Sequence, residues 1–410
     1  MNQNNPQIIV IGGGAAGFFG AITCATTYPH AQVTILEAGR KPLTKVRISG
    51  GGRCNVTHHC FEPAQLIQNY PRGGKALRGA FSRFQPQNTV AWFQERGVKL
   101  KTESDGRMFP VTDNSQTIID CLLNQAQQVG VKLRTGSVVT SVNTAEDRFT
   151  VSLKTGETLQ CDRLLLATGS NPLGYRFATK LGHTIEPPVP SLFTFNLTDA
   201  PWQHLAGVSV DKVCLHLVHS GKQKLSQTGP LLITHWGISG PAVLKLSAWG
   251  ARALYQNKYH LPLLINWLPD YNLETLRQQL LEIKKQYPRR QIMSWCPLPL
   301  PKRLWQCFVN LAGIGEQVCW NQLSKINLNK LVQELIQGRY EITGKGVFKE
   351  EFVTCGGVRL KELNFKTMES KQCPGLYFAG EILDIDGVTG GFNFQSAWTT
   401  GWLAGKAMGM

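Results

Sequence analysis

The chain has 410 residues, with 43 Lys and Arg against 27 Asp and Glu, so its formal net charge is +16. Hydrophobic residues make up 42%, and the 41 glycines and 21 prolines follow no period, which excludes intrinsic disorder and collagen-like or low-complexity chains. The length predicts two or three domains. A charge excess of this size indicates a polyanionic partner, such as a nucleic acid, an anionic membrane surface or an anionic cofactor.

The chain opens with the pattern of a dinucleotide-binding fold. Its parts follow in this order: an apolar strand over 7–11, the glycines Gly12, Gly14 and Gly17, a helix from Ala15 to about Thr26, and a second strand over 32–36 that ends at Glu37. Glycines permit a tight turn and a close approach to a pyrophosphate, which the helix N-terminus attracts. The acid at the end of the second strand binds ribose hydroxyls. The order of these elements therefore predicts a dinucleotide site.

Two later segments favour FAD over a nicotinamide as the bound dinucleotide. Residues 163–169 read as an apolar strand that ends in Ala167, Thr168 and Gly169, and residues 375–381 read as another that ends at Glu381. FAD enzymes of the glutathione-reductase type use both of these later strand ends to bind the cofactor. Because only one full glycine fingerprint is present, we expect one tightly held FAD and no separate nicotinamide domain.

The eleven cysteines are scattered and contain no C-x-x-C pair, which predicts reduced thiols in a cytoplasmic protein rather than disulfides or a zinc or iron–sulfur site. No metal is expected. Residues 8–25 are uncharged but lack the basic flank of a signal peptide, and no other stretch reaches the length of a membrane span. We therefore expect a cytoplasmic protein with no stable membrane association.

Four further segments carry a more specific resemblance. They are ISGGGRCNVT at 48–57, DGRMFPVT at 105–112, THWGISGPAVLKLS at 234–247 and the glycine-rich tail at 354–401. With them the chain resembles the BaiN/RdsA family of NAD(P)/FAD-dependent oxidoreductases essentially from end to end. The resemblance implies an α/β fold with a glutathione-reductase-like Rossmann FAD-binding domain at 1–190 and 350–410. A β-barrel-like domain at 191–270 and about 338–349, and a helical domain at 271–337, are inserted into it.

Local signals agree with the inserted domains. Short alternating segments at 193–197 and 213–218 predict strands. Apolar stripes predict helices after a capping Asn272 and before Gly338. The string Gly237-x-Ser239 hints at a nucleophile elbow, but Pro241 replaces the closing glycine, so a helix cap at Ser239 or Gly240 is favoured.

The resemblance also implies which residues hold the cofactor and carry the chemistry. For FAD these are Gly12, Gly14, Ala15, Ala16, Gly17, Glu37, Ala38, Lys45, Ser49, Gly50, Gly51, Gly52, Arg53, Cys54, Asn55, Val139, Ala167, Thr168, Gly169, Gly380, Glu381, Asp386, Gly390, Gly391, Asn393 and Gln395. Arg53 could balance the charge of reduced flavin or form an ordinary salt bridge. Cys54 could donate a proton or simply pack, and His235 could face the active site from an inserted domain.

The positive charge is concentrated. Residues 39–101 hold twelve Lys and Arg against two Glu, with aromatic residues interleaved, and a second basic cluster lies at 284–303. Basic residues beside stacking aromatics are typical of proteins that bind unpaired RNA; a solvated basic face over core aromatics is the alternative. The predicted RNA contacts are Arg72, Lys75, Arg78, Arg83, Lys284, Lys285, Arg289 and Arg290.

The resemblance implies a reaction as well. Members of the family include 23S rRNA dihydrouridine synthases, in which NAD(P)H would reduce FAD and a hydride would pass to C6 of a uridine while Cys54, His235 or water protonates C5. The base must be unstacked to reach the flavin. Two other functions stay open: a small-molecule flavin oxidoreductase acting on enones or amino ketones, and an FAD-dependent assembly or RNA-binding factor without enzymatic activity.

Overall fold

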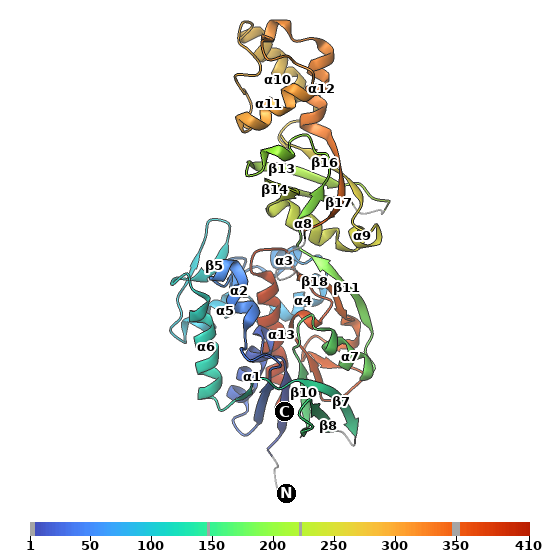
Figure 1. The fold of residues 1–410 in the computed structure, drawn as a ribbon. Helices are drawn as coiled ribbons and strands as arrows, with labels where there is room; N and C mark the ends of the chain where they lie inside the picture. The colour runs from blue at the N-terminus through green and yellow to red at the C-terminus, as the bar shows by residue number, and fades with distance from the viewer. Residues whose placement is uncertain (1–4, 146–147, 221–223, 347–352) are drawn as a thin grey trace. The chain divides into compact units, whose positions relative to one another are not determined.

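The structure, a computed structural model, describes residues 5–145, 148–220, 224–346 and 353–410 (Figure 1). The chain divides into two compact units, Met1–Val189 with Val353–Met410, and Pro190–Phe352. The limits of the first unit lie within three residues of those predicted for the FAD-binding domain. Residues 347–349, predicted to belong to the barrel, lie outside the described residues.

A seven-stranded sheet forms the centre of the first unit, in the order β19-β20-β21-β10-β1-β2-β6. Its β21, β10, β1, β2 and β6 are parallel, and β19 and β20 add an antiparallel edge. The strands that carry the predicted motifs are almost fully buried because helices cover them. The bounds are β1 Gln7–Ile11, β2 Gln32–Leu36, β6 Lys132–Arg134, β10 Arg163–Leu166, β19 Leu363–Asn364, β20 Glu369–Ser370 and β21 Leu376–Phe378.

Helices of the first unit pack on this sheet, with α1 and α13 side by side (Figure 1). Their contact is close because a Cβ at Gly401 of α13 would lie 2.6 Å from the carbonyl oxygen of Ala16 in α1. The last helix of the chain is therefore held against the first one. The bounds are α1 Ala15–Thr27, α2 Thr44–Gly52, α3 Pro63–Leu66, α4 Gly74–Phe81, α5 Pro86–Gln94, α6 Ser115–Gln128, α7 Pro172–Lys180 and α13 Phe392–Met408.

Three smaller sheets complete the first unit: β3-β5-β4, β7-β8-β9 and the pair β11-β18. The first of them follows the segment 48–57 in the chain. The bounds are β3 Thr57–His58, β4 Leu100–Thr102, β5 Arg107–Pro110, β7 Val139–Ala145, β8 Arg148–Leu153, β9 Thr158–Cys161, β11 Ile185–Ser191 and β18 Val353–Val358.

The second unit contains a closed barrel in the order β12-β15-β14-β13-β16-β17, which confirms the barrel-like prediction. Alternate residues of β13 and β16 point into its core, as the alternating sequence predicts. The bounds are β12 Phe195–Leu197, β13 Ser209–Leu217, β14 Leu225–Thr234, β15 Gly237–Ser239, β16 Leu261–Asn266 and β17 Gly338–Lys345.

Helices close the two ends of this barrel (Figure 1). Asn272 caps α10 with its side chain, and Gly240 with Pro241 opens α8, so both predicted caps are confirmed. One hydrophobic core runs from the barrel strands into the helices, so the two inserted domains predicted from the sequence form one compact unit. The bounds are α8 Pro241–Trp249, α9 Ala251–Gln256, α10 Leu273–Gln286, α11 Lys302–Leu311 and α12 Lys325–Gln337.

Two properties of the described residues bear on the sequence predictions. None of their helices combines the length and the apolar character that a membrane span requires. Nor do three or more of their His, Cys, Asp or Glu side chains gather as metal ligands would.

Candidate active site

The turn between β1 and α1 combines two tightly packed glycines with one open glycine. Gly12 has a φ of +112°, and a side chain there would collide with the carbonyl oxygen of Ala167. A side chain at Gly17 would collide with the carbonyl oxygen of Gly12, so Gly17 allows α1 to approach the strand closely. Around Gly14, the N-cap of α1, no atom lies within 4 Å of the place a Cβ would take. The N-terminus of α1 therefore adjoins an open space suited to a pyrophosphate.

Glu37, directly after β2, is fixed against this turn. Its Oε2 accepts a hydrogen bond from Gly13 N at 2.7 Å, and its Oε1 accepts one from Gly39 N at 2.6 Å. Its backbone carbonyl accepts a hydrogen bond from Ser137 N at 2.9 Å, which brings the segment leading into Val139 beside it. The carboxylate is thus held at the strand end where a dinucleotide-binding fold recognises ribose.

The ends of β10 and β21 lie together beside the first turn of α1. Ala379 N donates to Leu166 O at 3.1 Å, which aligns the two strand ends. A Cβ at Gly380 would lie 2.8 Å from the Cβ of Ala16. The structure thus brings together predicted cofactor residues from three distant segments: Ala15, Ala16, Ala167, Thr168, Gly169, Gly380 and Glu381.

Lys45 and Glu381, both predicted FAD contacts, are bonded to each other. Lys45 Nζ lies 2.5 Å from Glu381 Oε2, and Glu381 Oε1 accepts a hydrogen bond from Thr354 N at 3.0 Å. The Lys45 side chain is 59% exposed and that of Glu381 21% exposed, so both remain accessible. Ala38, predicted with them, is exposed directly after Glu37.

The glycine run at the end of α2 forms a second open surface. The chain leaves the helical path at Ser49, whose ψ is 148°, and Gly50, Gly51 and Gly52 then have φ values of 58°, 69° and 83°. No atom lies within 4 Å of the places that a Cβ would take at Gly51 or Gly52. Other residues would be strained at these angles and would fill the space. The backbone here can therefore come close to a flat ligand.

Cys54, predicted as a cofactor contact and proton donor, belongs instead to the core. Its side chain is fully buried, and its backbone N donates to Ser49 O at 3.0 Å. Burial raises the pKa of the thiol to about 12, although contact with Ser49 opposes this in part. A buried thiol with so high a pKa neither meets a substrate nor gives up a proton readily. The prediction of a catalytic Cys54 is wrong, and the packing alternative holds.

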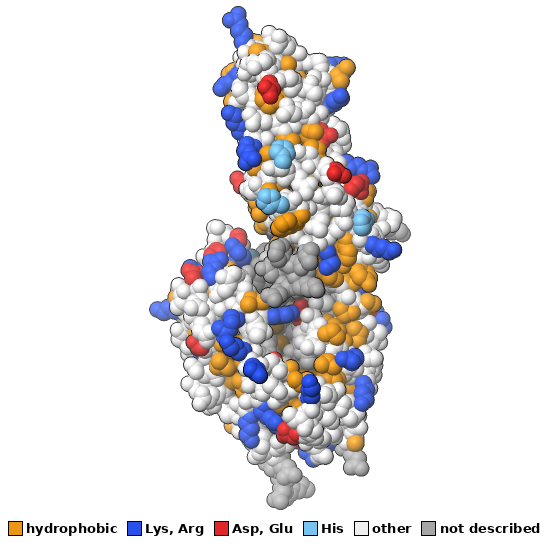
Figure 2. Space-filling model, viewed as in Figure 1, with side chains coloured by type: hydrophobic (Ala, Val, Ile, Leu, Met, Phe, Trp, Pro, Cys, Tyr) orange, Lys and Arg blue, Asp and Glu red, His pale blue; other side chains and the backbone are white. Residues whose placement is uncertain are grey.

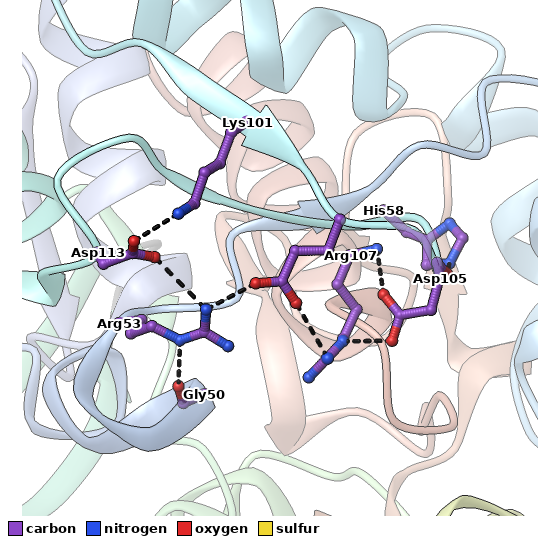
Figure 3. Close-up of polar contacts among 8 residues, drawn as sticks. Gly50, Arg53, His58, Lys101, Asp105, Arg107 and Asp113 are labelled. Atoms are coloured by element: carbon purple, nitrogen blue, oxygen red, sulfur yellow. Dashed lines mark hydrogen bonds and ion pairs between the residues drawn. The ribbon is translucent and has the colours of Figure 1, made fainter. Parts of the chain in front are cut away.

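Arg53 is held by carboxylates (Figure 3). Its Nη1 lies 2.6 Å from Glu103 Oε1 and 3.4 Å from Asp113 Oδ1, and its guanidinium carbon lies 3.9 Å from the centre of the Phe109 ring. Lys101 forms an ion pair with the same Asp113. These contacts favour the salt-bridge alternative for Arg53, and its predicted role beside reduced flavin stays a prediction.

The loop 385–391, which leads into α13, is tied to the chain before α4. Asp386 has a fully buried side chain, and Arg72 forms two hydrogen bonds to its carboxylate. The Arg72 side chain is itself only 15% exposed. The prediction of Arg72 as a surface contact for RNA is therefore wrong. The Asp386 carboxylate is engaged by Arg72 within the protein, and a contact of Asp386 to FAD stays a prediction.

Asn393 and Gln395, both predicted to contact FAD, use their side chains inside the protein. Asn393 accepts a hydrogen bond from Gly387 N and donates one to Gly387 O, both at 2.9 Å. The buried Gln395 Oε1 accepts hydrogen bonds from Thr57 Oγ1 at 2.6 Å and Thr89 Oγ1 at 2.9 Å. Both amides are thus engaged within the protein at the start of α13, and the predicted contacts of this region to FAD stay predictions.

The backbone at the start of α13 is joined to the segment that follows the glycine run. Gly390 and Gly391 have φ values of 135° and 89°, in the region that favours glycine. With its amide oriented to satisfy both neighbours, Asn55 accepts a hydrogen bond from Gly391 N at 2.9 Å and donates one to Thr57 O at 3.1 Å. Two segments that hold predicted FAD contacts thus meet at this point.

Three residues that contact the start of α13 or the loop before it were not among the predicted site residues: His58, Asn69 and Tyr70. The Tyr70 hydroxyl donates to Phe392 O at 2.7 Å, and Asn69 O accepts a hydrogen bond from Val388 N at 2.8 Å. The His58 ring stacks on Phe392 with a centroid distance of 4.7 Å, and its Nε2 lies 3.1 Å from Asp105 O. No local pattern could reveal these contacts, because Tyr70 and Phe392 are 322 residues apart in the chain.

His235 lies in the second unit, between β14 and β15. It is exposed, and its carbonyl accepts a hydrogen bond from Gln203 Nε2 at 2.7 Å. The cluster described above belongs to the first unit, so His235 is not one of its members. Its role in the reaction stays a prediction.

The predicted RNA contacts of the first unit differ in their surroundings. Lys75 and Arg78 are exposed on α4 and make no ion pair within the described ranges. Arg83 is exposed and donates to the carbonyl of Lys366. On the face seen in Figure 2, Lys and Arg side chains outnumber Asp and Glu on each unit. A surface hollow at the end of α4 is lined by Gly79, Ala80, Ser82, Arg83, Phe365 and Lys366.

The interleaved aromatic residues of this stretch mostly form core. Tyr70, Phe81, Phe84 and Phe93 are buried, so they cannot stack on bases, and the alternative of core aromatics beneath a basic face holds for them. In the second unit, Lys284 Nζ donates to Leu323 O at 2.7 Å, which makes it a structural residue rather than a free cation.

The geometry of the first unit indicates which class of protein this chain belongs to. Open glycine surfaces at Gly14 and at Gly51 and Gly52, the fixed carboxylate of Glu37 and the joined strand ends fit an extended dinucleotide with a flat ring system. This is the FAD-binding Rossmann fold of flavin-dependent oxidoreductases, with a barrel and helices inserted.

Comparison with known proteins identifies the family. The model of the HI0933-like protein Rossmann domain matches residues 6–407, and the chain belongs to this family. The ribosomal RNA dihydrouridine synthase of Escherichia coli K12 is 33% identical, over 97% of this chain and 96% of that protein. The 3-dehydro-bile acid Δ4,6-reductase of Clostridium scindens is 30% identical, over 98% of both chains. The solved 3-ketosteroid-Δ4-(5α)-dehydrogenase of Rhodococcus jostii RHA1 shares the fold, with a TM-score of 0.51, 12% identity, and coverage of 100% of this chain and 97% of that one.

Proposed function

We propose that this flavin oxidoreductase reduces a uridine of ribosomal RNA to dihydrouridine with electrons from NAD(P)H. The observation that carries the proposal is the pair of exposed cations on α4, Lys75 and Arg78, which form no ion pair with any residue that the structure describes. This helix begins directly after Gly73, where a side chain would collide with Ile385 of the loop before α13, so α4 and this loop belong to the same part of the first unit. An oxidoreductase that acts on small neutral substrates does not require exposed cations, whereas an enzyme that binds RNA uses them to contact the phosphates.

Different residues of the first unit would hold different parts of the cofactor. Bound FAD would supply the two-electron carrier, taking a hydride from NAD(P)H and giving one to C6 of the uridine. The N-terminus of α1 would hold the pyrophosphate, and Glu37 would hold ribose hydroxyls. The backbone at Gly51 and Gly52 would lie along the flat ring system. Carbon C5 takes a proton, which completes the addition of H₂ across the C5–C6 bond.

This proton can come from His58, His235 or solvent water. Among the residues predicted for this task, Cys54 is buried with a raised pKa. The His58 ring lies against Phe392 at the start of α13, its Nε2 lies 3.1 Å from Asp105 O, and its Nδ1 is buried (Figure 3).

The test uses purified protein loaded with FAD, an rRNA transcript and NADPH or NADH, with dihydrouridine measured by mass spectrometry. We expect product from the wild type, and at least about tenfold weaker RNA binding in K75E/R78E because two phosphate contacts are reversed in sign. The variant K132E/K154E makes the same charge change at exposed sites elsewhere on the first unit and serves as the control. Absence of dihydrouridine in vitro, together with an unchanged dihydrouridine map of 23S rRNA after gene deletion, would reject the proposal.

Reduction of a small-molecule enone is the second candidate, because the bile acid reductase is almost as similar to the chain as the RNA enzyme is. It requires the α4 cations to be incidental. NADPH oxidation that depends on a steroid enone, and that K75E/R78E leaves unchanged, would favour it.

A further inference from the structure

The loop after α10 presents an aromatic residue and several cations on the surface of the second unit. Tyr287 is 43% exposed, and its ring packs edge-on against that of Trp295 with a centroid distance of 5.0 Å. The Arg290 guanidinium carbon lies 4.2 Å from the centre of the Trp295 ring. A guanidinium held against an indole keeps its planar outer face available for a second flat partner.

Backbone hydrogen bonds hold this loop in place. Trp320 N donates to Arg290 O at 3.0 Å, and Asn321 N donates to Pro288 O at 2.9 Å. Farther along, the buried Trp305 Nε1 donates to Ile292 O at 2.8 Å. The exposed side chains therefore stand on a fixed backbone, which lowers the entropic cost of binding.

The surrounding charge is strongly positive. Residues 281–303 contain six Lys and Arg and one acid, Glu282. Lys302 and Arg303 are exposed in the first turn of α11, where the helix dipole disfavours cations, so helix stability does not explain them. Lys285 is exposed in the last turn of α10, although it also forms an ion pair with Glu282 at 3.0 Å.

We propose that Lys285, Tyr287, Arg289, Arg290 and Trp295 form a platform that binds unpaired RNA nucleotides. Bases would stack on the exposed ring of Tyr287 and on the Arg290 guanidinium, and phosphates would contact Lys285 and Arg289. This inference rests on the proposed function in that RNA is the partner, and it adds a second contact surface, on the α10–α12 end of the barrel (Figure 1). Flat side chains held beside cations suit unpaired bases, and binding to anionic vesicles is the competing outcome of the experiment below.

The experiment measures binding of fluorescein-labelled single-stranded U12 and of a 12-base-pair RNA duplex to the FAD-loaded full chain by anisotropy. We expect Y287A/R290A to weaken U12 binding by about tenfold or more and to affect the duplex less, because stacking needs unpaired bases. The control Y255A/K258A removes an exposed Tyr and an exposed Lys at the other end of the same barrel and should bind as the wild type does. FAD content and melting temperature verify that each variant is folded.

The outcomes separate the platform from the reaction. Equal U12 binding by wild type and Y287A/R290A would overturn the platform, even if both produce dihydrouridine. Loss of U12 binding in the variant would support the platform, even if the wild type forms no dihydrouridine. Binding of the wild type to anionic lipid vesicles but not to U12 would also overturn it.

Discussion

Two glycine-rich turns lead into helices of the first unit, and they are built in opposite ways. At Gly12–Gly17 the central Gly14 has empty space around it, and the nearby carboxylate of Glu37 is fixed by backbone donors. At the second turn, 385–391, the nearby polar side chains bond within the protein. Asp386 forms an ion pair with Arg72, and Asn393, just after the turn, forms two hydrogen bonds with Gly387. The first turn leaves open space beside a helix N-terminus, whereas the second is held by its own ion pair and amide. Similar glycine patterns in a sequence can therefore mark either a binding surface or a braced loop.

The largest effect is expected at the buried ion pair of the braced loop. D386N leaves the buried Arg72 without its counter-charge, so the free energy of unfolding should fall by about 3–5 kcal/mol in urea denaturation. The control E157Q breaks an exposed pair with Arg134 and should cost less than about 1 kcal/mol. Equal effects of the two substitutions would mean that the pair does not brace the loop.

The open turn should respond in the opposite sense, losing ligand rather than stability. G14A places a methyl group where no protein atom is near, so FAD affinity, measured by flavin fluorescence titration, should fall at least about tenfold. The apoprotein should unfold within about 1 kcal/mol of the wild type. G12A is the contrast, because its positive φ and the collision with Ala167 should destabilise the fold itself. An unaltered FAD affinity in G14A would contradict the site.

A smaller effect is expected at Asn393. N393A removes both hydrogen bonds to Gly387, so the free energy of unfolding should fall by about 1–2 kcal/mol. N257A removes an exposed Asn side chain that bonds within its own helix end, and it should change stability by less than about 0.5 kcal/mol. If N393A weakened FAD binding while leaving stability unchanged, the second turn would be a ligand surface after all.

The smallest expected effect is a pH dependence of the free energy of unfolding that arises from His183 and Glu362, outside both turns. Burial lowers the pKa of His183 below its ordinary 6.5, although Glu362 opposes this. Burial would raise the pKa of Glu362, but hydrogen bonds from Thr184 and His183 lower it below 4.5. Because both pKa values are lower in the folded protein, the unfolded chain takes up protons first: on His183 as pH falls below about 6.5, and on Glu362 as it falls below about 4.5. The free energy of unfolding should therefore fall as pH drops through 6.5 and fall further below 4.5.

The measurement is the melting temperature between pH 7 and pH 5, for the wild type and H183Q. The variant should lose the His183 part of the slope, with FAD affinity at pH 7 unchanged. An equal slope in both proteins would show that His183 does not contribute.

The sequence by itself determined the Rossmann order of strand, glycine turn, helix and acid, because those elements are local and their periodicities are visible along the chain. β1, β2 and β10 begin or end at the predicted residues, and the caps at Asn272 and Gly240 form as expected. The resemblance to a family extended this to the barrel and to the cofactor.

Only the tertiary structure decided which charged and polar side chains are free. Arg53 meets Glu103, and Arg72 meets Asp386 across 314 residues. Whether a cation faces solvent or a buried carboxylate depends on such distant partners, and side-chain identity at one position does not specify them. The burial of Cys54 and the exposure of Lys75 were settled in the same way, by the packing of elements remote in sequence.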